Sequence, residues 1–473
     1  MYKWLKVALV LGIMVFGLGA LAQEKVVLTF AYPTWFTDYP RFLNWYIPAF
    51  ERYMEARGTP VEIKVMELPA PDDPYREATL LRLAAGTHAD IFANDTFYIP
   101  ADALAGYLLD LTPYVEKWPE WKFWVPAAKD AITFQGRVWG LNRDTDVRPM
   151  YYRKDIFELA GLPVPWQPAS WDDILEAARA IKAKRAEIAK ALGVSDVVPV
   201  AFKAGILGGE ATTMQGFYML LLGAGGRLYD AESGKWVAKS SALLDTLKFY
   251  YKIYIEEKLS VEPEFWMAGA PVDKIHLYLS NVGQRPNEPA LAMLVTWDGV
   301  WYDTVNPEHE RYIPDPPGRD AVLAYCKMPA KEPGAGIRGQ DFVTISGGWG
   351  MVINAATEHP DIAFEFLKFV HSKGEMLASR IDVPGSIRLP ARWDLTEDPV
   401  YQKLATPYDI FCATELVPLT TVRPGLTEYP KVSDLVQEAT EKILLGEKPG
   451  DVLDWYAKAL KQLVGAESVI ELP

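Results

Sequence analysis

Aromatic side chains that stand beside turn residues are the first candidates for chemistry in this chain. The 473 residues include 16 Trp, 24 Tyr and 19 Phe, and most of these rings are expected to pack in a core. Core packing does not explain the rings next to Pro and Gly in Tyr32-Pro33-Thr34-Trp35-Phe36 and Gly347-Gly348-Trp349-Gly350. A flat ring in a loop offers a ligand an apolar face, and glycine lets the backbone approach that ligand closely. Tyr32, Trp35 and Trp349 are therefore candidate ligand contacts.

Two charged side chains in glycine-containing segments form a second set of candidates. Glu210 follows Gly208-Gly209, and Arg388 ends the segment Gly385-Ser386-Ile387-Arg388. A carboxylate accepts hydrogen bonds and a guanidinium group donates them, so a polar ligand could be held by both. We include Glu210 and Arg388 among the candidate ligand contacts.

The elements that must position these residues alternate between strand and helix along the first hundred residues. Apolar spacing predicts strands over residues 26–30, 61–68 and 89–92, separated by helices over residues 42–53 and 75–85. Such alternation favours a mostly parallel sheet with helices on both faces, in which ligands bind beyond the carboxyl ends of the strands. Tyr32 and Trp35 follow the first strand, where this rule places a ligand.

Further signals describe scaffold and boundaries. Ser170 and Asp173 form a capping box at the start of an amphipathic helix. The segment from residue 307 to 339 is rich in Pro and Gly and is interpreted as a boundary zone. Because the sequence has no repeat, low-complexity run or Ser/Gly linker, short strand crossings are expected to join its domains.

Residues 1–22 have the layout of a cleavable export signal. Lys3 and Lys6 precede an apolar run over residues 7–18, and the small-residue ending Ala20-Leu21-Ala22 follows. An apolar run of this length is shorter than the ~20 residues that span a bilayer. We expect cleavage near Ala22 and Gln23, with a mature chain that works outside the cytoplasm. No cysteine stands at the start of that mature chain for lipid attachment.

Composition excludes several classes of function. The net charge of −14 and pI near 5.0 argue against a nucleic-acid or anionic-membrane surface, which needs clustered Lys and Arg. Two cysteines, Cys326 and Cys412, are too few for a disulfide framework and are expected to be buried free thiols. The five histidines lack the spacing of a zinc motif, so neither a metal centre nor a cofactor is expected.

The order of several segments resembles the extracellular solute-binding proteins of carbohydrate ABC importers, the family that includes maltose-binding protein. The resemblance covers nearly the whole mature chain, and it rests on the shared order of segments that are individually weak. These segments are Leu83 to Phe92, Gly106 to Thr112, Gly136 to Leu141, Tyr151 to Phe157, Ser170 to Asp173, Ala292 to Trp301 and Gly347 to Asn354.

The resemblance implies an α/β periplasmic binding protein-like fold with two lobes and a ligand cleft between them. Lobe 1 would comprise residues 23–143 and 327–372, and lobe 2 would comprise residues 147–325 and 375–473. The chain would cross between the lobes at hinges near residues 142–146 and 325–329. Ligand binding is expected to draw the lobes together.

The resemblance also implies acidic ligand contacts. Asp95 and Asp146 fall on sugar-contacting positions of the family, the first in lobe 1 and the second at the crossing. Each could instead be a solvated loop acid or a helix cap. Arg143, Asp144 and Arg148 surround Asp146, so this stretch could hold ligand or form a structural ion-pair cluster; Arg148 is included as a candidate.

Trp301 matches the family tryptophan that supplies a stacking face in the second lobe. It is the aromatic residue expected to contribute most to binding, with core packing as the alternative. Trp297 and Asp298 precede it and could form a second contact pair, although Trp297 could instead close the strand predicted over residues 291–296.

The function implied is delivery of a carbohydrate, expected to be an oligosaccharide, to the membrane permease of an ABC importer. The mature protein is expected to be a periplasmic monomer without catalytic turnover. One alternative is the same fold with another solute, such as a polyol, glycerol phosphate or polyamine, since fold does not fix the ligand. A secreted glycoside hydrolase is a further alternative, because paired acids and tryptophan platforms also describe hydrolase sites.

Overall fold

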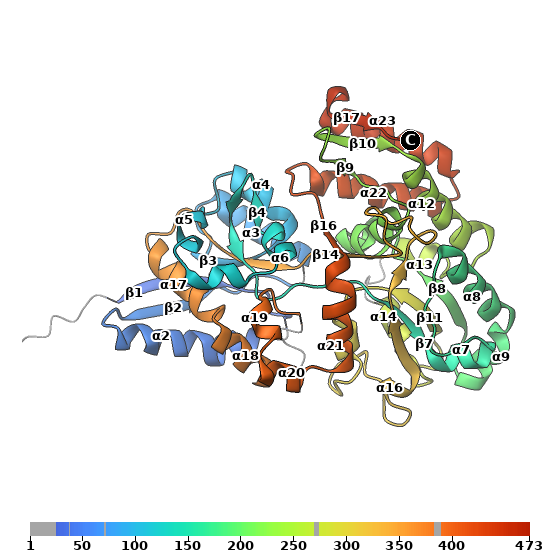
Figure 1. The fold of residues 1–473 in the computed structure, drawn as a ribbon, viewed down its shortest axis with the longest axis horizontal. Coiled ribbons are helices and arrows are strands. Elements are labelled where there is room, and N and C mark those ends of the chain that lie inside the picture. Colours follow the sequence, from blue (N-terminus) through green and yellow to red (C-terminus); the bar gives the residue numbers. More distant parts are fainter. Residues whose placement is uncertain (1–24, 37, 71, 269–273, 383–388) are drawn as a thin grey trace, which may run out of the picture.

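The computed structural model describes residues 25–473 except 37, 71, 269–273 and 383–388. Two α/β units lie side by side, each built around its own sheet (Figure 1). Separate clusters of buried apolar side chains fill the two units, which we call the first and second lobes. The predicted export signal over residues 1–22 and the candidate Arg388 lie outside the described residues.

The first lobe contains a five-stranded sheet in the order β2-β1-β3-β15-β6. Its strands are β1 (Val26–Ala31), β2 (Val61–Val65), β3 (Ile91–Asp95), β6 (Gly140–Leu141) and β15 (Trp349–Ile353). Its main helices are α2 (Ile47–Ala56), α3 (Asp72–Ala84), α4 (Ile99–Leu104), α5 (Thr112–Val115), α6 (Pro126–Ala131), α17 (Pro360–Val370) and α18 (Lys373–Asp382). These bounds confirm the predicted alternation of strand and helix over the first hundred residues.

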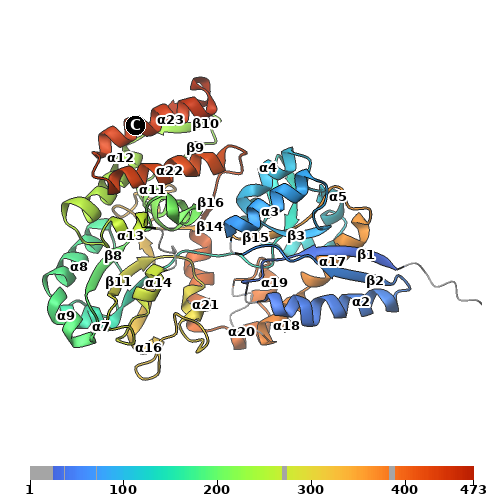
Figure 2. The ribbon, with the colours of Figure 1, turned by 180° about the vertical axis from the view of Figure 1, so that it is seen from behind.

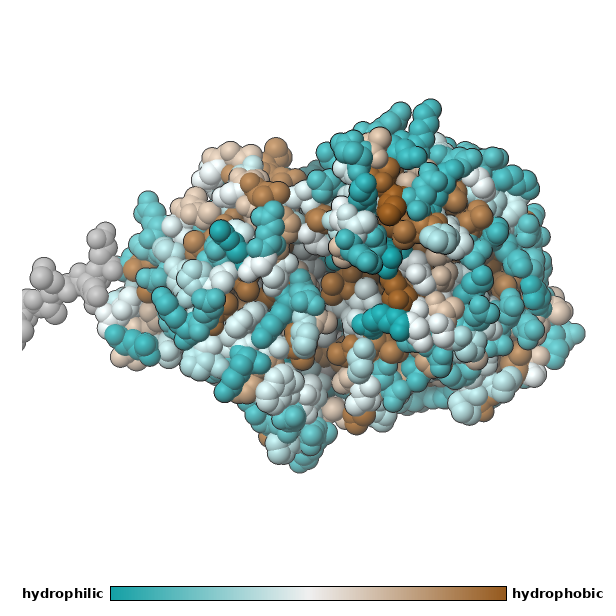
Figure 3. Space-filling model, turned by 45° about the horizontal axis from the view of Figure 1, so that its top comes forward, coloured by the Kyte–Doolittle hydropathy of each residue, from teal (hydrophilic) through white to brown (hydrophobic). Residues whose placement is uncertain are grey.

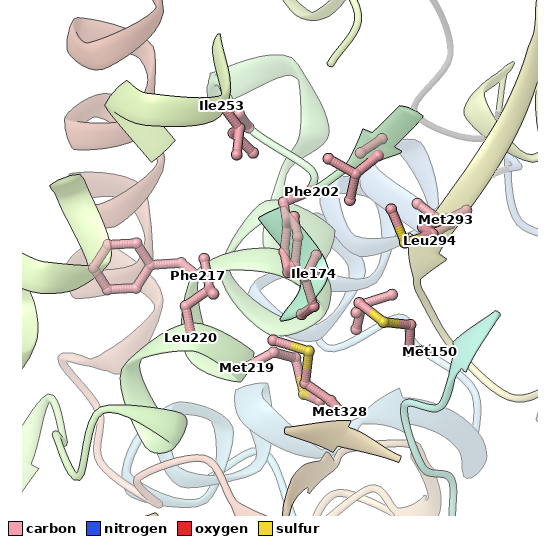
Figure 4. Packing of buried hydrophobic residues seen from close by; sticks show 14 of the residues in the cluster. Met150, Ile174, Phe202, Phe217, Met219, Leu220, Ile253, Met293, Leu294 and Met328 are labelled. Atoms are coloured by element: carbon pink, nitrogen blue, oxygen red, sulfur yellow. The ribbon is translucent and has the colours of Figure 1, made fainter. Parts of the chain in front are cut away.

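The second lobe contains a four-stranded sheet in the order β12-β7-β11-β8. Its strands are β7 (Met150–Arg153), β8 (Val197–Ala201), β11 (Ala290–Val295) and β12 (Leu323–Cys326). Its main helices are α7 (Lys154–Ala160), α8 (Trp171–Ala183), α9 (Arg185–Leu192), α11 (Tyr218–Gly223), α12 (Ser241–Tyr251), α22 (Tyr429–Leu444) and α23 (Pro449–Val464). Methionine, leucine and phenylalanine side chains from strands and helices meet in its core (Figure 4).

The strands predicted over the first hundred residues are parallel to one another, as expected, and each sheet adds one strand, β15 or β7, that runs in the opposite direction. β1 pairs in parallel with β2 and β3, and β8 pairs in parallel with β11. In contrast, β15 runs antiparallel to β3 and β6, and β7 runs antiparallel to β11 and β12. β7 and β15, the two reversed strands, are the first strands that the chain forms in each sheet after it passes from one lobe to the other.

The chain passes between the lobes along segments that lie together in the middle of the molecule (Figures 1 and 2). The first passage joins β6 to β7. On the return, β14 (Phe342–Ser346) still packs in the second core through Val343 and Ile345, and β15 belongs to the first sheet. We therefore propose that the return hinge lies at residues 346–349 and not at residues 325–329.

A third passage follows α18. This helix lies in the first lobe, where the Tyr46 hydroxyl donates to the Glu375 carbonyl. α21 (Pro407–Phe411) instead contributes Tyr408 to the second core. We propose that the boundary expected near residue 375 lies between α20 (Pro399–Leu404) and α21.

Two sequence-based expectations concern single features of the fold. Ser170 and Asp173 form the predicted capping box, with hydrogen bonds in both directions. Cys326 and Cys412 are buried, and neither forms a disulfide within the described residues, as predicted. Within the described residues, no helix combines the length and apolar character needed to cross a membrane.

Candidate functional site

Arg423 connects acidic residues of the two lobes. It follows β16 (Thr420–Val422), the strand that pairs with β14. Its Nη2 donates to the Asp95 carboxylate at 2.7 Å in the first lobe, and its Nη1 donates to the Glu210 carboxylate of the second lobe at 3.2 Å. Arg423 thus brings two of the sequence-predicted acids into one ion-pair network across the lobe boundary.

Local structure fixes both carboxylates. Asp95 is the last residue of β3 and caps the short helix that follows, where it accepts from the Phe97 amide. Glu210 begins a short helix after Gly209 and accepts from the Tyr429 hydroxyl at 2.8 Å and the Ser433 hydroxyl at 2.5 Å. Both acidic side chains remain about one fifth exposed, 20% for Asp95 and 19% for Glu210, so a ligand can reach them.

Asp146 and Arg148 lie at the hinge beside this network. Arg148 Nη1 donates to Asp146 at 2.6 Å and to the Ile345 carbonyl at 2.9 Å. The Gly347 amide donates to the same Asp146 oxygen at 2.7 Å. The two residues therefore tie the outgoing passage of the chain to the returning one.

The carboxylates differ in their acid–base properties. Burial raises the pKa of Asp95 above its ordinary value, and the Arg423 charge offsets only part of that rise. Burial likewise raises the pKa of Glu210, with Arg423 again opposing the rise. Burial also disfavours the charged form of Asp146, but Arg148 and the Gly347 amide outweigh it and hold its pKa below the ordinary value.

An aromatic cluster adjoins Asp95 in the first lobe. Trp349 stands opposite Asp95 in the pairing of β15 with β3. Its ring centroid lies 6.3 Å from that of Trp35, 5.2 Å from that of Phe36 and 5.8 Å from that of Tyr75. We call Trp35, Phe36, Tyr75 and Trp349 the first-lobe cluster; its two tryptophans are half-buried.

Tyr32 lies behind this cluster. Its ring is 8% exposed and packs against the rings of Phe30, Phe36 and Phe42 in the first core. The Phe36 ring packs against both Tyr32 and Trp349 and so connects them. Tyr32 thus supports the cluster from the core side, and direct contact of Tyr32 with ligand stays a prediction.

Trp301 lies in a different aromatic cluster inside the second lobe. It is 5% exposed, with the Tyr408 ring nearly parallel to it at 4.9 Å. The Tyr325 centroid lies 5.0 Å away, and the Arg319 guanidinium carbon lies 3.9 Å from the indole centroid. We call Tyr151, Trp301, Tyr325 and Tyr408 the second-lobe cluster. Stacking of a ligand on Trp301 stays a prediction and would require these neighbours to move.

Trp297 and Asp298 follow β11 and lie beside the second-lobe cluster. The Trp297 ring is half-buried and covers Gly299, where an added Cβ would lie 1.7 Å from the indole. Asp298 is 1% exposed, and its carbonyl accepts from the hydroxyls of Tyr151 and Tyr408 at 3.0 and 2.9 Å. The Asp298 main chain therefore holds that cluster in place, and ligand contact by either residue stays a prediction.

A pocket adjoins Arg423 where the first lobe faces the chain after β16, and the surface is hollowed between the two lobes (Figure 3). The pocket is lined by Thr96, Phe97, Ile99, Pro100, Asp130, Ala131, Thr133, Ser346, Val422, Arg423, Pro424 and Gly425. Sequence reasoning missed Arg423. Arg423 precedes Pro424-Gly425, and a Pro-Gly pair is a turn signal. Glycines of a turn singled out Trp349, so the same kind of signal could have identified Arg423.

The described part of the chain contains no group of three or more His, Cys, Asp or Glu that could hold a metal ion. It does contain a group of charged side chains that can form hydrogen bonds, close to the indole rings of the first-lobe cluster. These side chains are Asp95, Glu210, Asp146, Arg148 and Arg423. Such a set can bind the polar edge and the apolar face of a small organic ligand without a cofactor.

Comparison with known proteins assigns the family. The family model of the bacterial extracellular solute-binding proteins matches residues 39–376. The chain belongs to this family. The match spans the whole first sheet except its first strand, together with the second sheet.

Curated relatives of this family member are binding proteins by name. The arabinooligosaccharide-binding protein of Halalkalibacterium halodurans is 24% identical over 352 residues, which cover 74% of this chain and 69% of the relative. The lactose-binding protein of Rhizobium radiobacter is 26% identical over 246 residues, covering 52% of this chain and 48% of the relative.

Solved structures of other binding proteins share the fold. Maltose-bound T. maritima MalE3 matches with a TM-score of 0.71 at 21% identity, covering 93% of this chain and all of that one. A Listeria monocytogenes substrate-binding protein in complex with cycloalternan matches with a TM-score of 0.68 at 20% identity, covering 93% of this chain and 100% of that chain. These likenesses confirm the predicted α/β, periplasmic binding protein-like fold.

The structure sorts the sequence-predicted site residues into three groups. Asp95, Asp146, Arg148 and Glu210 gather around Arg423 between the lobes. Trp35 and Trp349 adjoin that network, with Tyr32 behind them. Trp297, Asp298 and Trp301 lie with the second-lobe cluster.

Proposed function

We propose that this protein is the carbohydrate-binding component of an ABC importer. It binds a neutral sugar, chiefly an oligosaccharide, between its two lobes and delivers it unchanged to the membrane permease. The observation that carries the proposal is the Arg423 network of Asp95 and Glu210, one carboxylate from each lobe, next to the half-buried indole of Trp349.

The chemistry of this site suits a sugar. Carboxylates and guanidinium groups can hydrogen bond the hydroxyls at the edge of a sugar ring, and an indole can cover the C–H groups on its face. Because the polar groups are already held by protein partners, they are oriented before the ligand arrives, which reduces the entropy cost of binding.

The charges of the site favour a neutral ligand over an anionic one. Three carboxylates, Asp95, Asp146 and Glu210, stand near two guanidinium groups, those of Arg148 and Arg423. Glycerol phosphate would bring further negative charge to this set, which disfavours that alternative.

The names of relatives agree with a carbohydrate. Those relatives include proteins named for arabinooligosaccharide and lactose, and structures with bound maltose and cycloalternan. A polyol is the second candidate, because structures with bound ribitol and D-mannitol match this chain with TM-scores of 0.63.

The remaining parts of the proposal concern location and assembly. We propose that the chain is exported, cleaved near Ala22 and Gln23, and monomeric in the periplasm. We further propose that it does not hydrolyse its sugar. Incubation with a bound oligosaccharide that yields shorter sugars in proportion to protein would contradict this last point.

A ligand screen on the mature chain tests the function. The panel comprises maltose, maltotriose, lactose, arabinotriose, ribitol and mannitol, with glycerol phosphate and spermidine as rivals. A sugar that binds only the folded state stabilises it by about 2.7 kcal/mol at 100 times its Kd and raises the melting temperature. Stabilisation by glycerol phosphate or spermidine alone would overturn the carbohydrate assignment, and stabilisation by no compound would overturn the proposed function.

A further inference from the structure

A buried polar network lies at the carboxyl edge of the second sheet. β8 and β11 are parallel neighbours, ending at Ala201 and Val295. Lys203 and Thr296 follow these two strand ends and are 1% and 0% exposed. Since ligands of α/β sheets bind beyond the carboxyl ends of strands, this network stands where a second-lobe contact is expected.

Gln215 joins the two residues and has a fixed orientation. Its Oε1 accepts from Lys203 Nζ at 2.6 Å and from the Thr296 hydroxyl at 2.8 Å. An ammonium group has only donors, so the atom facing Lys203 must be the amide oxygen and not the nitrogen. His276 Nε2 lies 2.9 Å from the Thr296 hydroxyl and extends the network into the core.

The amide nitrogen of Gln215 is consequently directed away from the network. Among the described residues, the hydrogen bonds of this side chain all fall on Oε1. Gln215 is half-buried, and its Nε2 is not among the fully buried atoms that lack a partner. The nitrogen is therefore accessible, with two N–H donors to offer.

The residues on either side place Gln215 between the network and the lobe boundary. A Cβ on Gly216 would lie 2.6 Å from the Lys203 carbonyl, so only glycine allows this close approach. On the other side, a Cβ on Gly347 would lie 3.2 Å from Met214 Cε and 3.0 Å from Arg423 Nη2. The helical turn Thr213–Phe217, which carries Gln215, thus lies between the buried network and the Arg423 site.

We propose that Gln215 is a specificity-determining residue that donates hydrogen bonds through Nε2 to a hydroxyl or ring oxygen of the sugar. Lys203 and Thr296 are positioning residues, which hold the amide so that a donor and not an acceptor faces the ligand. This inference rests on the proposed function. It adds to the site a hydrogen-bond donor, which the carboxylates cannot supply. A sugar without an acceptor at that position loses the bond.

Gln215→Glu is the test, because a carboxylate still accepts from Lys203 and Thr296 but presents an acceptor outward. The probe is the panel sugar with the lowest Kd for the wild-type protein, measured by calorimetry with the melting temperature of the ligand-free protein. We expect the Kd to rise about tenfold or more while the melting temperature does not fall. Gln462→Glu, the same change on the exposed surface of α23, should leave the Kd unchanged.

Monodeoxy analogues of the same sugar separate a ligand contact from a structural role. With the wild-type protein, one analogue should bind about tenfold more weakly than the parent sugar. With the Gln215→Glu variant, the same analogue should bind no more weakly than the parent sugar. If the variant is itself destabilised, Thr296→Val decides, since it removes one of the two donors to Oε1 and should also raise the Kd.

The outcomes distinguish this inference from the function on which it rests. An unchanged Kd in Gln215→Glu, or in Thr296→Val where that variant decides, overturns the role of Gln215 and leaves the proposed function standing. If the wild-type protein binds no compound of the panel, the proposed function and this inference fall together.

Discussion

Trp349 and Trp301 both follow glycine-containing turns, but the two lobes give them different surroundings. Trp349 is half-buried, its three aromatic neighbours stand at 68° to 86° to its ring, and Asp95 lies opposite it in the sheet. Trp301 is 5% exposed, and Tyr408 lies at 21° to its ring and 4.9 Å away. The nearly parallel Tyr408 ring occupies a stacking face of Trp301.

We propose that this difference separates a binding platform, Trp349, from a core residue, Trp301. A tryptophan binds a sugar when one face is open and polar partners stand at its edge. In the first-lobe cluster, Trp349 is half-buried with its three aromatic neighbours edge-on, and Asp95 of the Arg423 network lies opposite it, so we propose that it meets both conditions. The second-lobe cluster has hydroxyls bonded to the Asp298 carbonyl and an indole covered by protein, as expected of packing.

The largest effect is expected from Trp301→Ala, as a loss of stability. Removing a buried indole leaves a cavity in the second core and should cost about 3 to 5 kcal/mol of unfolding free energy. Urea unfolding of the ligand-free protein measures this cost, and Trp301→Phe should lose less. A stable Trp301→Ala variant with strongly weakened sugar binding would reverse the assignment of the two clusters.

Arg423→Met should have the next largest effect. It removes the hydrogen bonds that join Asp95 and Glu210 across the lobe boundary and should cost about 2 to 3 kcal/mol. Water at the partly exposed carboxylates keeps this below the cost for a fully buried pair. Urea unfolding measures the loss of stability. Solution scattering measures the expected separation of the lobes.

Arg179→Met is the matched control for Arg423→Met. Arg179 pairs with Glu257 at 2.7 Å on the surface, with a side chain 45% exposed, and its loss should cost less than about 1 kcal/mol. Equal effects of the two substitutions would show that the inter-lobe pairs are no stronger than a surface pair.

Trp349→Ala should weaken sugar binding with little effect on the fold. If the indole and the sugar bury about 80 Å² of apolar surface together, the loss is about 2 kcal/mol, or roughly 30-fold in Kd. Calorimetry with the best panel sugar gives the Kd, and the melting temperature of the ligand-free variant gives the stability. A large drop in melting temperature with unchanged Kd would make Trp349 a core residue like Trp301.

The smallest effects concern pH and distinguish Asp146 from Asp95. The lowered pKa of Asp146 stabilises the fold above the ordinary value of 3.8, and this contribution is lost as pH falls through the lowered pKa. The raised pKa of Asp95 has the opposite sign: its contribution is complete below 3.8 and is lost as pH rises through the raised pKa.

Asp146→Asn and Asp95→Asn make that contrast measurable. As pH rises from about 3 to 7, the stability advantage of wild type should grow relative to Asp146→Asn and shrink relative to Asp95→Asn. Urea unfolding at several pH values gives both slopes. Slopes of the same sign would contradict the assignment of the two environments.

Local signals predicted much of the fold. The capping box of Ser170 and Asp173 depends on two residues that are three apart in sequence. The first strands and helices depend on the spacing of apolar residues. Both kinds of signal are visible in the sequence. The antiparallel direction of β15 cannot be seen in the sequence, because it depends on the passage of the chain between the lobes. The return hinge that we propose at residues 346–349 is not visible in sequence for the same reason, because it depends on the packing of Val343 and Ile345 in the second core.

The site was predictable by residue type but not by assembly. Turn signals selected Trp349 and Glu210 as candidates, and family resemblance selected Asp95. Arg423 meets Asp95 across 328 residues of sequence, and no local pattern reports such a contact. Resemblance also selected Trp301, whose contact with ligand stays a prediction; a motif carries no information on the tyrosine 107 residues later that packs against its ring.

The central claim is that a sugar binds between the lobes, against Trp349 and the Arg423 network. A crystal structure of the protein with the best panel sugar tests it most directly. The account predicts sugar carbons within about 4 Å of the Trp349 ring, hydroxyls bonded to Asp95 or Glu210, and the Gln215 amide nitrogen donating to a sugar oxygen. A sugar seated on Trp301, or bound outside the space between the lobes, would contradict it.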